Sequence, residues 1–348
     1  MIYTNRFPIF NIQLFAEPNT NTTGSEGLSG EMKTYYDTEL LENAREELYF
    51  NQFGKVQNLP QGKGKKVEWR KFKTYSAKTK PLTEGVTPDG NTMEMTTLEA
   101  EVNQYGDYTT ISDVLDLTAI DDVILICTEE HGAQAGLTLD TLTRNALMKG
   151  TNVYRAGDKD SMSAMTADDK ISPTFVNKLV TQLKKNKVPK IDGKYVMIIH
   201  PSVSEDLRED AAWIDVHKYA ATTEIFNGEI GELHGVRFIE SNEVAVTKQG
   251  SGSRALYHNF IFGKDAYGRV ELSGAAMEMI VKQMGSAGTA DPLNQRSTVG
   301  WKAAHCARVL YTERIIRAVT ASSYNDDANY GVNYDETTPG DTDYEIVK

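Results

Sequence analysis

Apolar residues recur at three- and four-residue intervals through one long segment of the chain. The recurring positions are Ile120, Ile124, Cys127, His131, Ala135, Leu139, Leu142 and Ala146. This spacing predicts an α-helix of roughly 30 residues, or about 45 Å, that starts near Thr118 and stops at Gly150. Gly132 and Gly136 lie on one side of it. Because glycine weakens a helix, we expect a neighbouring backbone to pack closely there.

The segment from Lys55 to Ser112 instead shows the period of two that is typical of β-strands. Val67 and Trp69 alternate with charged residues, and the apolar positions change parity after Met95. The change of parity predicts a bulge or a break into two strands. Turn residues over 81–90 lie near the middle, so the whole segment is predicted to be a long β-hairpin. A hairpin this polar has too little apolar surface to fold alone, and we expect it to lean on another surface.

The second half of the chain mixes the two periods. Helices are expected over residues 173–187 and from Ser202 onward. Strands are expected over residues 195–200, 236–240, 255–262, 270–272, 277–283, 299–311 and 315–319. This mixture indicates an α+β fold. We expect the last two strands to return to the long helix.

Both ends of the chain depart from this pattern. Residues 19–30 are polar and glycine-rich, which predicts a flexible arm. An amphipathic helix is expected over residues 31–54, ending at Gly54. Beyond Ser322 the chain is acidic and rich in turn residues, which predicts a mobile tail.

Charge is distributed unevenly along the 348 residues. The formal net charge of -12 argues against general nucleic-acid binding, yet residues 55–80 carry nine Lys or Arg residues against the single acid Glu68. Interleaved aromatic residues would allow this stretch to bind nucleic acid. The six acids of residues 31–47 offer a complementary surface on another copy of the chain. Contact between copies, which would set their orientation and register, DNA contact and a merely solvated face are the three alternatives for this stretch.

Groups that could carry chemistry are not arranged for it. The six histidines form no H-E-x-x-H motif, and Ser202 is not in a hydrolase elbow. Cys127 and Cys306 lack a CxxC partner and are expected to be reduced core thiols. The glycine-rich residues 61–66 lack the spacing of a phosphate-binding loop. We therefore expect no enzymatic activity, no cofactor and no metal site.

Membrane and export signals are also missing from the pattern. No stretch approaches the ~20 apolar residues that a membrane-spanning helix needs. Short apolar runs near the N-terminus are interrupted by Pro8, Asn11 and Gln13, so they lack the continuous core of a signal peptide. We expect neither export by that route nor insertion into a membrane.

Five motifs, in a fixed order from about Tyr35 to Ala321, resemble one protein family. They are Leu82–Gly90 (LTEGVTPDG), Gln104–Asp121 (QYGDYTTISDVLDLTAID), Gln134–Leu147 (QAGLTLDTLTRNAL), Asn227–Phe238 (NGEIGELHGVRF) and Gly285–Lys302 (GSAGTADPLNQRSTVGWK). Together they resemble the major capsid proteins of tailed phages, in the branch typified by the coat protein of coliphage N-four. The resemblance implies the Hong Kong 97 type capsid fold, in the α+β class.

That fold implies an N-terminal arm, an extended β-hairpin or extension loop, a peripheral domain with a spine helix, and an axial domain. The expected ranges are a flexible arm (1–30), an N-terminal helix (31–54), the extension-loop hairpin (55–112), the peripheral domain with the spine helix (113–169), the axial domain (170–284), the return strands of the peripheral domain (285–321) and an acidic flexible tail (322–348).

The resemblance also implies a function. The chain is expected to assemble into the hexamers and pentamers of an icosahedral phage head, built in the host bacterial cytoplasm and enclosing double-stranded DNA on its inner face. The polar N-terminal residues are too few for an internal scaffold, so we expect a separate scaffolding protein, besides a portal protein and a possible decoration protein. An encapsulin-like compartment and an enzyme of unfamiliar fold are the alternatives. Contacts between subunits are predicted at Lys65, Lys66, Arg70, Glu84, Asp107 and Arg296.

Overall fold

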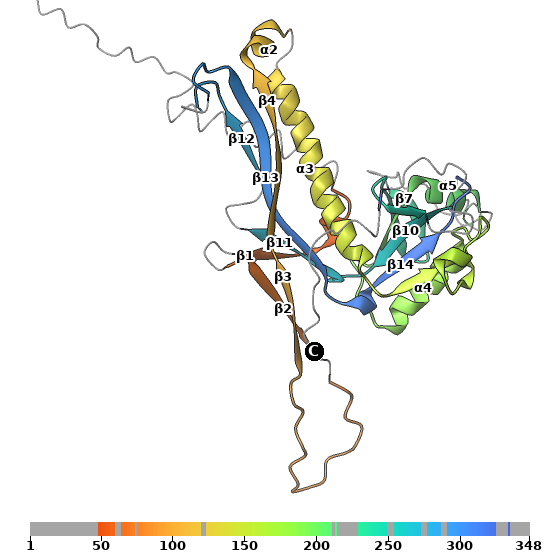
Figure 1. Cartoon of the computed structure of the whole chain (residues 1–348). Coiled ribbons are helices and arrows are strands. Elements are labelled where there is room, and N and C mark those ends of the chain that lie inside the picture. Colours follow the sequence, from red (N-terminus) through yellow and green to blue (C-terminus); the bar gives the residue numbers. More distant parts are fainter. Residues whose placement is uncertain are drawn as a thin grey trace, which may run out of the picture.

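A computed structural model describes the chain over residues 48–59, 64–73, 75–119, 123–210, 213, 229–248, 254–272, 277–286, 291–324 and 333–334. Two β-sheets, a long helix and a projecting hairpin dominate this part of the chain (Figure 1). The expected arm over 1–30 and most of the expected helix over 31–54 lie outside the described residues. Asn51–Phe53 form a 3-10 turn, η1, so the last turn of that expected helix is not α-helical.

The first sheet has five strands and is organised around β13, Arg296–Val309. Its other strands are β1 (Lys55–Leu59), β4 (Asn103–Ser112), β11 (Tyr267–Leu272) and β12 (Glu278–Lys282). Because β13 is 14 residues long, it pairs with β4 along one side and with both β12 and β11 along the other. β1 pairs in parallel with β11. One long strand therefore sets the register of three antiparallel neighbours.

The long helix predicted from the apolar spacing is α3, Val123–Met148, and it runs along β13 (Figure 1). Ala135 and Leu139 pack in one apolar cluster with Val299 and Trp301 of β13. Gly132 and Gly136 are both buried, and the close packing of a neighbouring backbone at these two positions stays a prediction. The start signal at Thr118 instead closes a separate short helix, α2 (Asp113–Thr118), whose first turn is capped by the side chain of Ser112.

The second sheet has seven strands and is buried on both faces. Its members are β5 (Val153–Arg155), β6 (Tyr195–Ile199), β7 (Glu229–Leu233), β8 (Val236–Glu240), β9 (Ala245–Lys248), β10 (Ala255–Phe262) and β14 (Ile315–Thr320). Helices α4 (Pro173–Lys185) and α5 (Pro201–Glu209) pack in one apolar cluster with Met197. Ile198, the next residue of β6, faces the opposite cluster, together with Phe50 and Leu147. This double burial explains why β6 is apolar throughout.

Strand pairing divides the chain differently from the expected ranges. β14 was expected beside the long helix, but it pairs with β10 and β5 in the second sheet. Conversely, β11 and β12 fall in the range 170–284, yet they pair with β13 in the first sheet. The chain therefore crosses between the two sheets more often than the order of elements indicated, because hydrogen-bonding partners are chosen over long sequence separations.

The hairpin is shorter than the predicted range 55–112. β2 (Lys66–Phe72) and β3 (Met95–Glu101) pair antiparallel over seven residues without a register shift. The bulge or break predicted after Met95 is therefore wrong, because Met95 is exposed and only the apolar positions from Leu98 onward face the buried side. The flanking strands β1 and β4 belong to the first sheet. Residues 75–94 extend beyond β2 and β3 as an arm that projects away from both sheets (Figure 1).

The close approach of β4 and β13 gives a first prediction. A Cβ atom at Gly300 would lie 2.6 Å from the carbonyl oxygen of Asp107 and 2.6 Å from the Cβ of Tyr108. Because a backbone oxygen cannot turn away, we expect Gly300→Ala to lower the free energy of unfolding by about 1–3 kcal/mol. The measurement is urea unfolding of the unassembled protein. Gly90→Ala is the matched control, since a Cβ there meets nothing within 4 Å. Equal stability of the two variants would contradict the packing of these strands.

Candidate functional site

The root of the hairpin is fastened to the first sheet by apolar contacts. Val67 and Trp69 are buried and point to one side of β2, whereas Glu68 between them is exposed. The indole of Trp69 covers Gly268 so closely that a Cβ there would lie 3.0 Å from the ring. Val67 and Trp69 belong to one cluster with Ala304 and Cys306 of β13. These contacts hold the root in a fixed position on the first sheet. The projecting arm could not hold such a position by itself.

Charged and aromatic side chains reinforce the root. The Nζ atom of Lys71 lies 3.3 Å from a carboxylate oxygen of Glu313 and 4.6 Å from the ring centroid of Tyr311. The guanidinium of Arg314 lies 4.0 Å from the same centroid. Tyr311 is thus contacted by two cations, an arrangement that the electron-rich face of the ring favours. The distal end of β2 is held against the segment that joins β13 to β14.

The arm beyond the root is exposed along its whole length, over residues 75–94. Lys73 and Glu94 close its base with an ion pair of 2.6 Å. Apolar side chains along the arm and its base are exposed, with Leu82 at 77%, and they comprise Phe72, Tyr75, Leu82, Val86, Met93 and Met95. Several apolar side chains exposed on one projection are typical of an interaction surface.

The six residues predicted to contact other subunits are all exposed, but they are spread over the molecule. Lys65, Lys66 and Arg70 lie at the root, and Glu84 lies in the arm. Lys66 and Arg70 face acids of the hairpin, Glu99 at 3.7 Å and Glu68 at 3.9 Å, and such exposed pairs contribute about 0–1 kcal/mol. Lys65 and Glu84 make no ion pair with any residue that the structure describes. Their role between subunits stays a prediction.

Asp107 and Arg296 lie on the first sheet and already have partners in their own chain. Asp107 accepts a hydrogen bond of 2.8 Å from the side-chain amide of Gln134 in α3, and this bond is the main cause that lowers the pKa of its carboxyl. Gln134 in turn accepts a bond of 3.0 Å from the indole of Trp301. The backbone N–H of Arg296 donates to Asp291 at 2.8 Å. Asp107 therefore links β4 to α3, whatever it contacts outside the chain.

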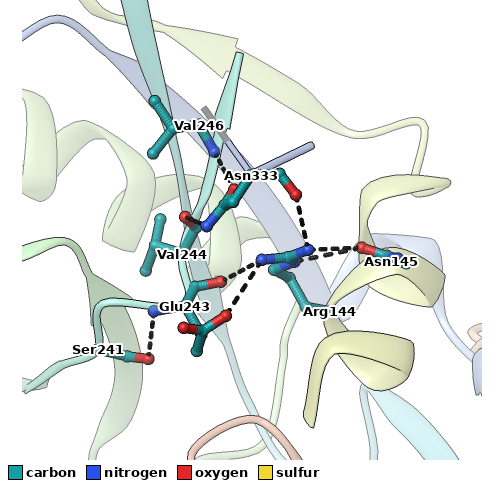
Figure 2. A network of polar contacts seen from close by, with 7 residues as sticks. All are labelled: Arg144, Asn145, Ser241, Glu243, Val244, Val246 and Asn333. Carbon is teal, nitrogen blue, oxygen red and sulfur yellow. Dashed lines mark hydrogen bonds and ion pairs between the residues drawn. The ribbon is translucent and has the colours of Figure 1, made fainter. Parts of the chain in front are cut away.

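A buried polar centre, which the sequence did not reveal, lies at the junction of α3 and the second sheet (Figure 2). The side chain of Arg144 is 2% exposed. Its guanidinium donates a hydrogen bond of 2.9 Å to the backbone carbonyl of Glu243 and one of 3.2 Å to the backbone carbonyl of Asn333. The Glu243 carboxylate lies 3.6 Å away, and the side chain of Asn145 accepts two further bonds. Asp140, four residues before Arg144 on the buried face of α3, was the available signal, because an acid and a base at this spacing rarely enter a core without partners.

Asp140 fastens the N-terminal end of the described chain to α3. Its Oδ1 atom accepts a hydrogen bond of 2.9 Å from the backbone N–H of Asn51. The hydroxyl of Tyr267 donates to the carbonyl of Phe50. Burial raises the pKa of the Asp140 carboxyl to about 7, a shift that nearby Glu243 strengthens and that the Asn51 N–H opposes. An acid that is fully charged in water is therefore partly protonated here near neutral pH.

Two buried histidines and the two cysteines pack within the fold. His258 lies 2.8 Å from the Thr247 hydroxyl, and His305 lies 3.0 Å from that of Thr143. Burial lowers the pKa of His258 to about 3 and that of His305 to about 4. Cys127 and Cys306 are free. Within the described ranges, no group of three or more His, Cys, Asp or Glu side chains is placed to hold a metal ion. None of the helices in those ranges has the length and apolar character to cross a membrane.

Comparison with known proteins agrees with the motifs. A family model described as phage capsid protein matches residues 140–290. The capsid of cyanophage P-SCSP1u is similar in structure, with a TM-score of 0.62 and 17% identity over 79% of this chain and 89% of that chain. The capsid of Ralstonia phage GP4 has a TM-score of 0.64 and 14% sequence identity, over 80% of this chain and 92% of that chain. The capsid of cyanophage Pam1 has a TM-score of 0.63 and 12% sequence identity, over 81% of this chain and 92% of that chain. No curated protein matches the chain.

Two of the sequence predictions are thereby confirmed. The resemblance to the major capsid proteins of tailed phages is supported by a family model built on phage capsid proteins. The Hong Kong 97 type fold is supported by the structural neighbours, which share it at low sequence identity.

The burial of Asp140 gives a second prediction. Its pKa is about 7 in the folded chain and about 3.9 in an unfolded chain, so the protonated form is favoured by folding. The contribution of this carboxyl to stability is then full below about pH 4 and falls by up to about 4 kcal/mol as the pH rises to 7, whereas the buried neutral His258 and His305 contribute in the opposite direction. Asp140→Asn keeps an oxygen for the Asn51 N–H but cannot ionise, so we expect that fall to be largely removed.

Urea unfolding at pH 4.5 and pH 8 measures this difference. Asp192→Asn, in an exposed turn, is the matched control and should retain the pH dependence of the parent chain. An unchanged pH dependence in Asp140→Asn would show that another group is responsible.

Proposed function

We propose that this chain, a phage capsid protein by its family match and its fold, is the major subunit of a tailed-phage head. It would assemble into hexamers and pentamers of an icosahedral shell that encloses double-stranded DNA. The observation that carries the proposal is the arm over residues 75–94, which is exposed throughout although it carries apolar side chains and stands on a fixed root.

A neighbouring copy is the partner that this arm fits best. Leu82 and Val86 are exposed, and burying such side chains would gain about 1.5–3 kcal/mol each. The arm has no other surface of its own chain to bury them against, among the residues that the structure describes. In a closed ring of identical subunits every arm meets the same neighbouring surface, so no apolar arm is left exposed.

Charge supports contact between copies. The basic stretch of residues 55–80 includes the root and part of the arm, and residues 31–47 carry six acids. Lys65, Lys66, Arg70 and Glu84 lie at the root or in the arm, where a neighbour would approach them. Asp107 of β4 and Arg296 of β13 are proposed as contacts on the first sheet. Pairing would orient subunits more than it would strengthen the shell.

The other partners follow from the same proposal. A separate scaffolding protein would direct closure of the shell, a portal protein would replace capsid subunits at one vertex, and decoration proteins would bind outside. The head would be assembled in the bacterial cytoplasm and would remain in the virion. The proposed role is structural, without catalysis.

Light scattering after size-exclusion chromatography, followed by negative-stain microscopy, tests the function. The protein is measured with and without a co-expressed candidate scaffold. Rings or closed shells of megadalton mass are expected. A folded 38.7 kDa monomer under both conditions, even at high concentration, would contradict the proposal. Nuclease-resistant DNA inside particles from infected cells is expected, whereas protein cargo would favour a compartment.

Removing the arm gives a third prediction. Replacing residues 76–91 by Asn-Gly leaves the buried root intact, so we expect the unfolding midpoint of the monomer to change by less than about 2 °C. Shell formation should be lost, because the distal part of the arm, with Leu82 and Val86, is gone. The control is the double variant Thr83→Ser and Thr87→Ser, which keeps the arm. Shells of normal size from the shortened chain would exclude the arm as an assembly contact.

Reversing charge at the root gives a fourth prediction. The double variant Lys65→Glu and Lys66→Glu should slow assembly at least tenfold at low salt, and the difference should shrink near 1 M salt because screening weakens exposed pairs. The rate of light-scattering increase is the measurement. Lys184→Glu with Lys185→Glu carries the same change of charge on α4 and serves as the control. Equal rates for the two double variants would exclude a specific role of the root.

A further inference from the structure

Asn333 fills a hydrogen-bonding position at a strand edge. β9 pairs with β10 along one side only. On the other side of β9, the side-chain oxygen of Asn333 accepts a hydrogen bond of 2.9 Å from the backbone N–H of Val246 (Figure 2). The side-chain nitrogen of Asn333 donates a hydrogen bond of 3.1 Å to the backbone carbonyl of Val244. One amide thus supplies the acceptor and the donor that a neighbouring strand would supply.

The backbone of Asn333 completes the partners of Arg144. Its carbonyl accepts from Nη2 of the guanidinium, while Nη1 donates to the carbonyl of Glu243 (Figure 2). Arg144 belongs to α3, and Glu243 directly precedes Val244 at the edge of the second sheet. A buried cation that loses a partner is costly, because water cannot replace the lost bond. Asn333 is therefore bound to α3 and to the sheet at once.

Two further contacts hold this part of the chain. The side chain of Tyr334 packs against the apolar cluster that contains Phe50 and Leu147. Earlier in the chain, the hydroxyl of Ser323 donates a hydrogen bond of 2.7 Å to the buried carboxylate of Asp206 in α5. The acidic tail was predicted to be mobile from residue 322 onward, but residues 322–324 and 333–334 are held in place, and its other residues lie outside the described ranges.

We propose that the edge of β9, Arg144 and the adjoining apolar cluster form a peptide-binding site whose ligand is the chain's own segment Asn333–Tyr334. Occupancy of this site fastens α3, which packs on the first sheet, to the second sheet. The site is selective for asparagine followed by an aromatic residue. Aspartate has no N–H to donate to the Val244 carbonyl, and the aromatic ring is needed to cover the cluster. This inference does not depend on the proposed function.

The test uses the full chain and three substitutions. Asn333→Asp and Asn333→Ala should speed hydrogen exchange of the amides in residues 244–248 at least tenfold and lower the unfolding midpoint by several degrees. Asn329→Asp is the matched control, with the same change of charge four residues earlier, and should leave both quantities unchanged. Unchanged exchange in both Asn333 variants would overturn the proposal.

A second experiment tests binding directly. A chain that ends at residue 332 should show the same faster exchange, whereas a chain that ends at residue 334 should behave like the full protein. A synthetic peptide of residues 329–338 should restore slow exchange to the chain that ends at 332, and the same peptide with Asn333→Asp should not. Equal rescue by both peptides would overturn the claimed selectivity. Faster exchange in the chain ending at 334 would show that the ligand lies further along the tail.

Discussion

The pairing of β13 with three strands is the interaction on which the rest of the structure depends. Its length of 14 residues allows β12 and β11 to pair in succession along one side while β4 pairs along the other. The same strand supplies Val299 and Trp301 to the face that α3 covers. After the turn at Tyr311 the chain enters β14 of the second sheet. One continuous segment therefore supports the long helix and joins the two sheets.

The chain crosses between the two sheets in several places, and the buried centre at the end of α3 adds side-chain connections to these crossings. Arg144 reaches Glu243 beside the second sheet, and Asp140 holds the chain at Asn51. Buried ions contribute little net stability, because desolvation offsets their attraction. Their geometry is demanding, however, and the bonds of Arg144 to the carbonyls of Glu243 and Asn333 require α3 to keep its position against the second sheet. Such a centre favours a unique angle between the two sheets.

This angle matters because it fixes where the hairpin points. The root is attached to the first sheet through Trp69 and to the link between β13 and β14 through Lys71. The arm beyond it has no apolar contact with its own chain within the described residues. A rigid root with an exposed arm places apolar side chains at a defined distance and direction from the body. That property is what a subunit of a closed shell needs, since every copy must present its arm to the next in the same way.

The sequence by itself determined the local elements, because they depend on short-range periodicity and on capping. α3 follows from apolar residues at helical spacing, α4 from an amphipathic run that begins at Pro173, and β10 from a strand-like run of mostly apolar and aromatic residues. The motifs also predicted the fold and the resemblance to phage capsid proteins. The six contact residues were chosen for charge and resemblance, and the structure shows only that they are exposed.

Tertiary structure decided which strands pair and which polar groups meet. β14 joined β10 and not the long helix, and β11 and β12 joined β13, because pairing depends on surfaces brought together from distant parts of the chain. The bond between Arg144 and Asn333 spans 189 positions, so no local pattern could indicate it. Periodicity specifies how a segment folds, but partners far apart in sequence are selected by the burial and hydrogen bonding of the whole chain.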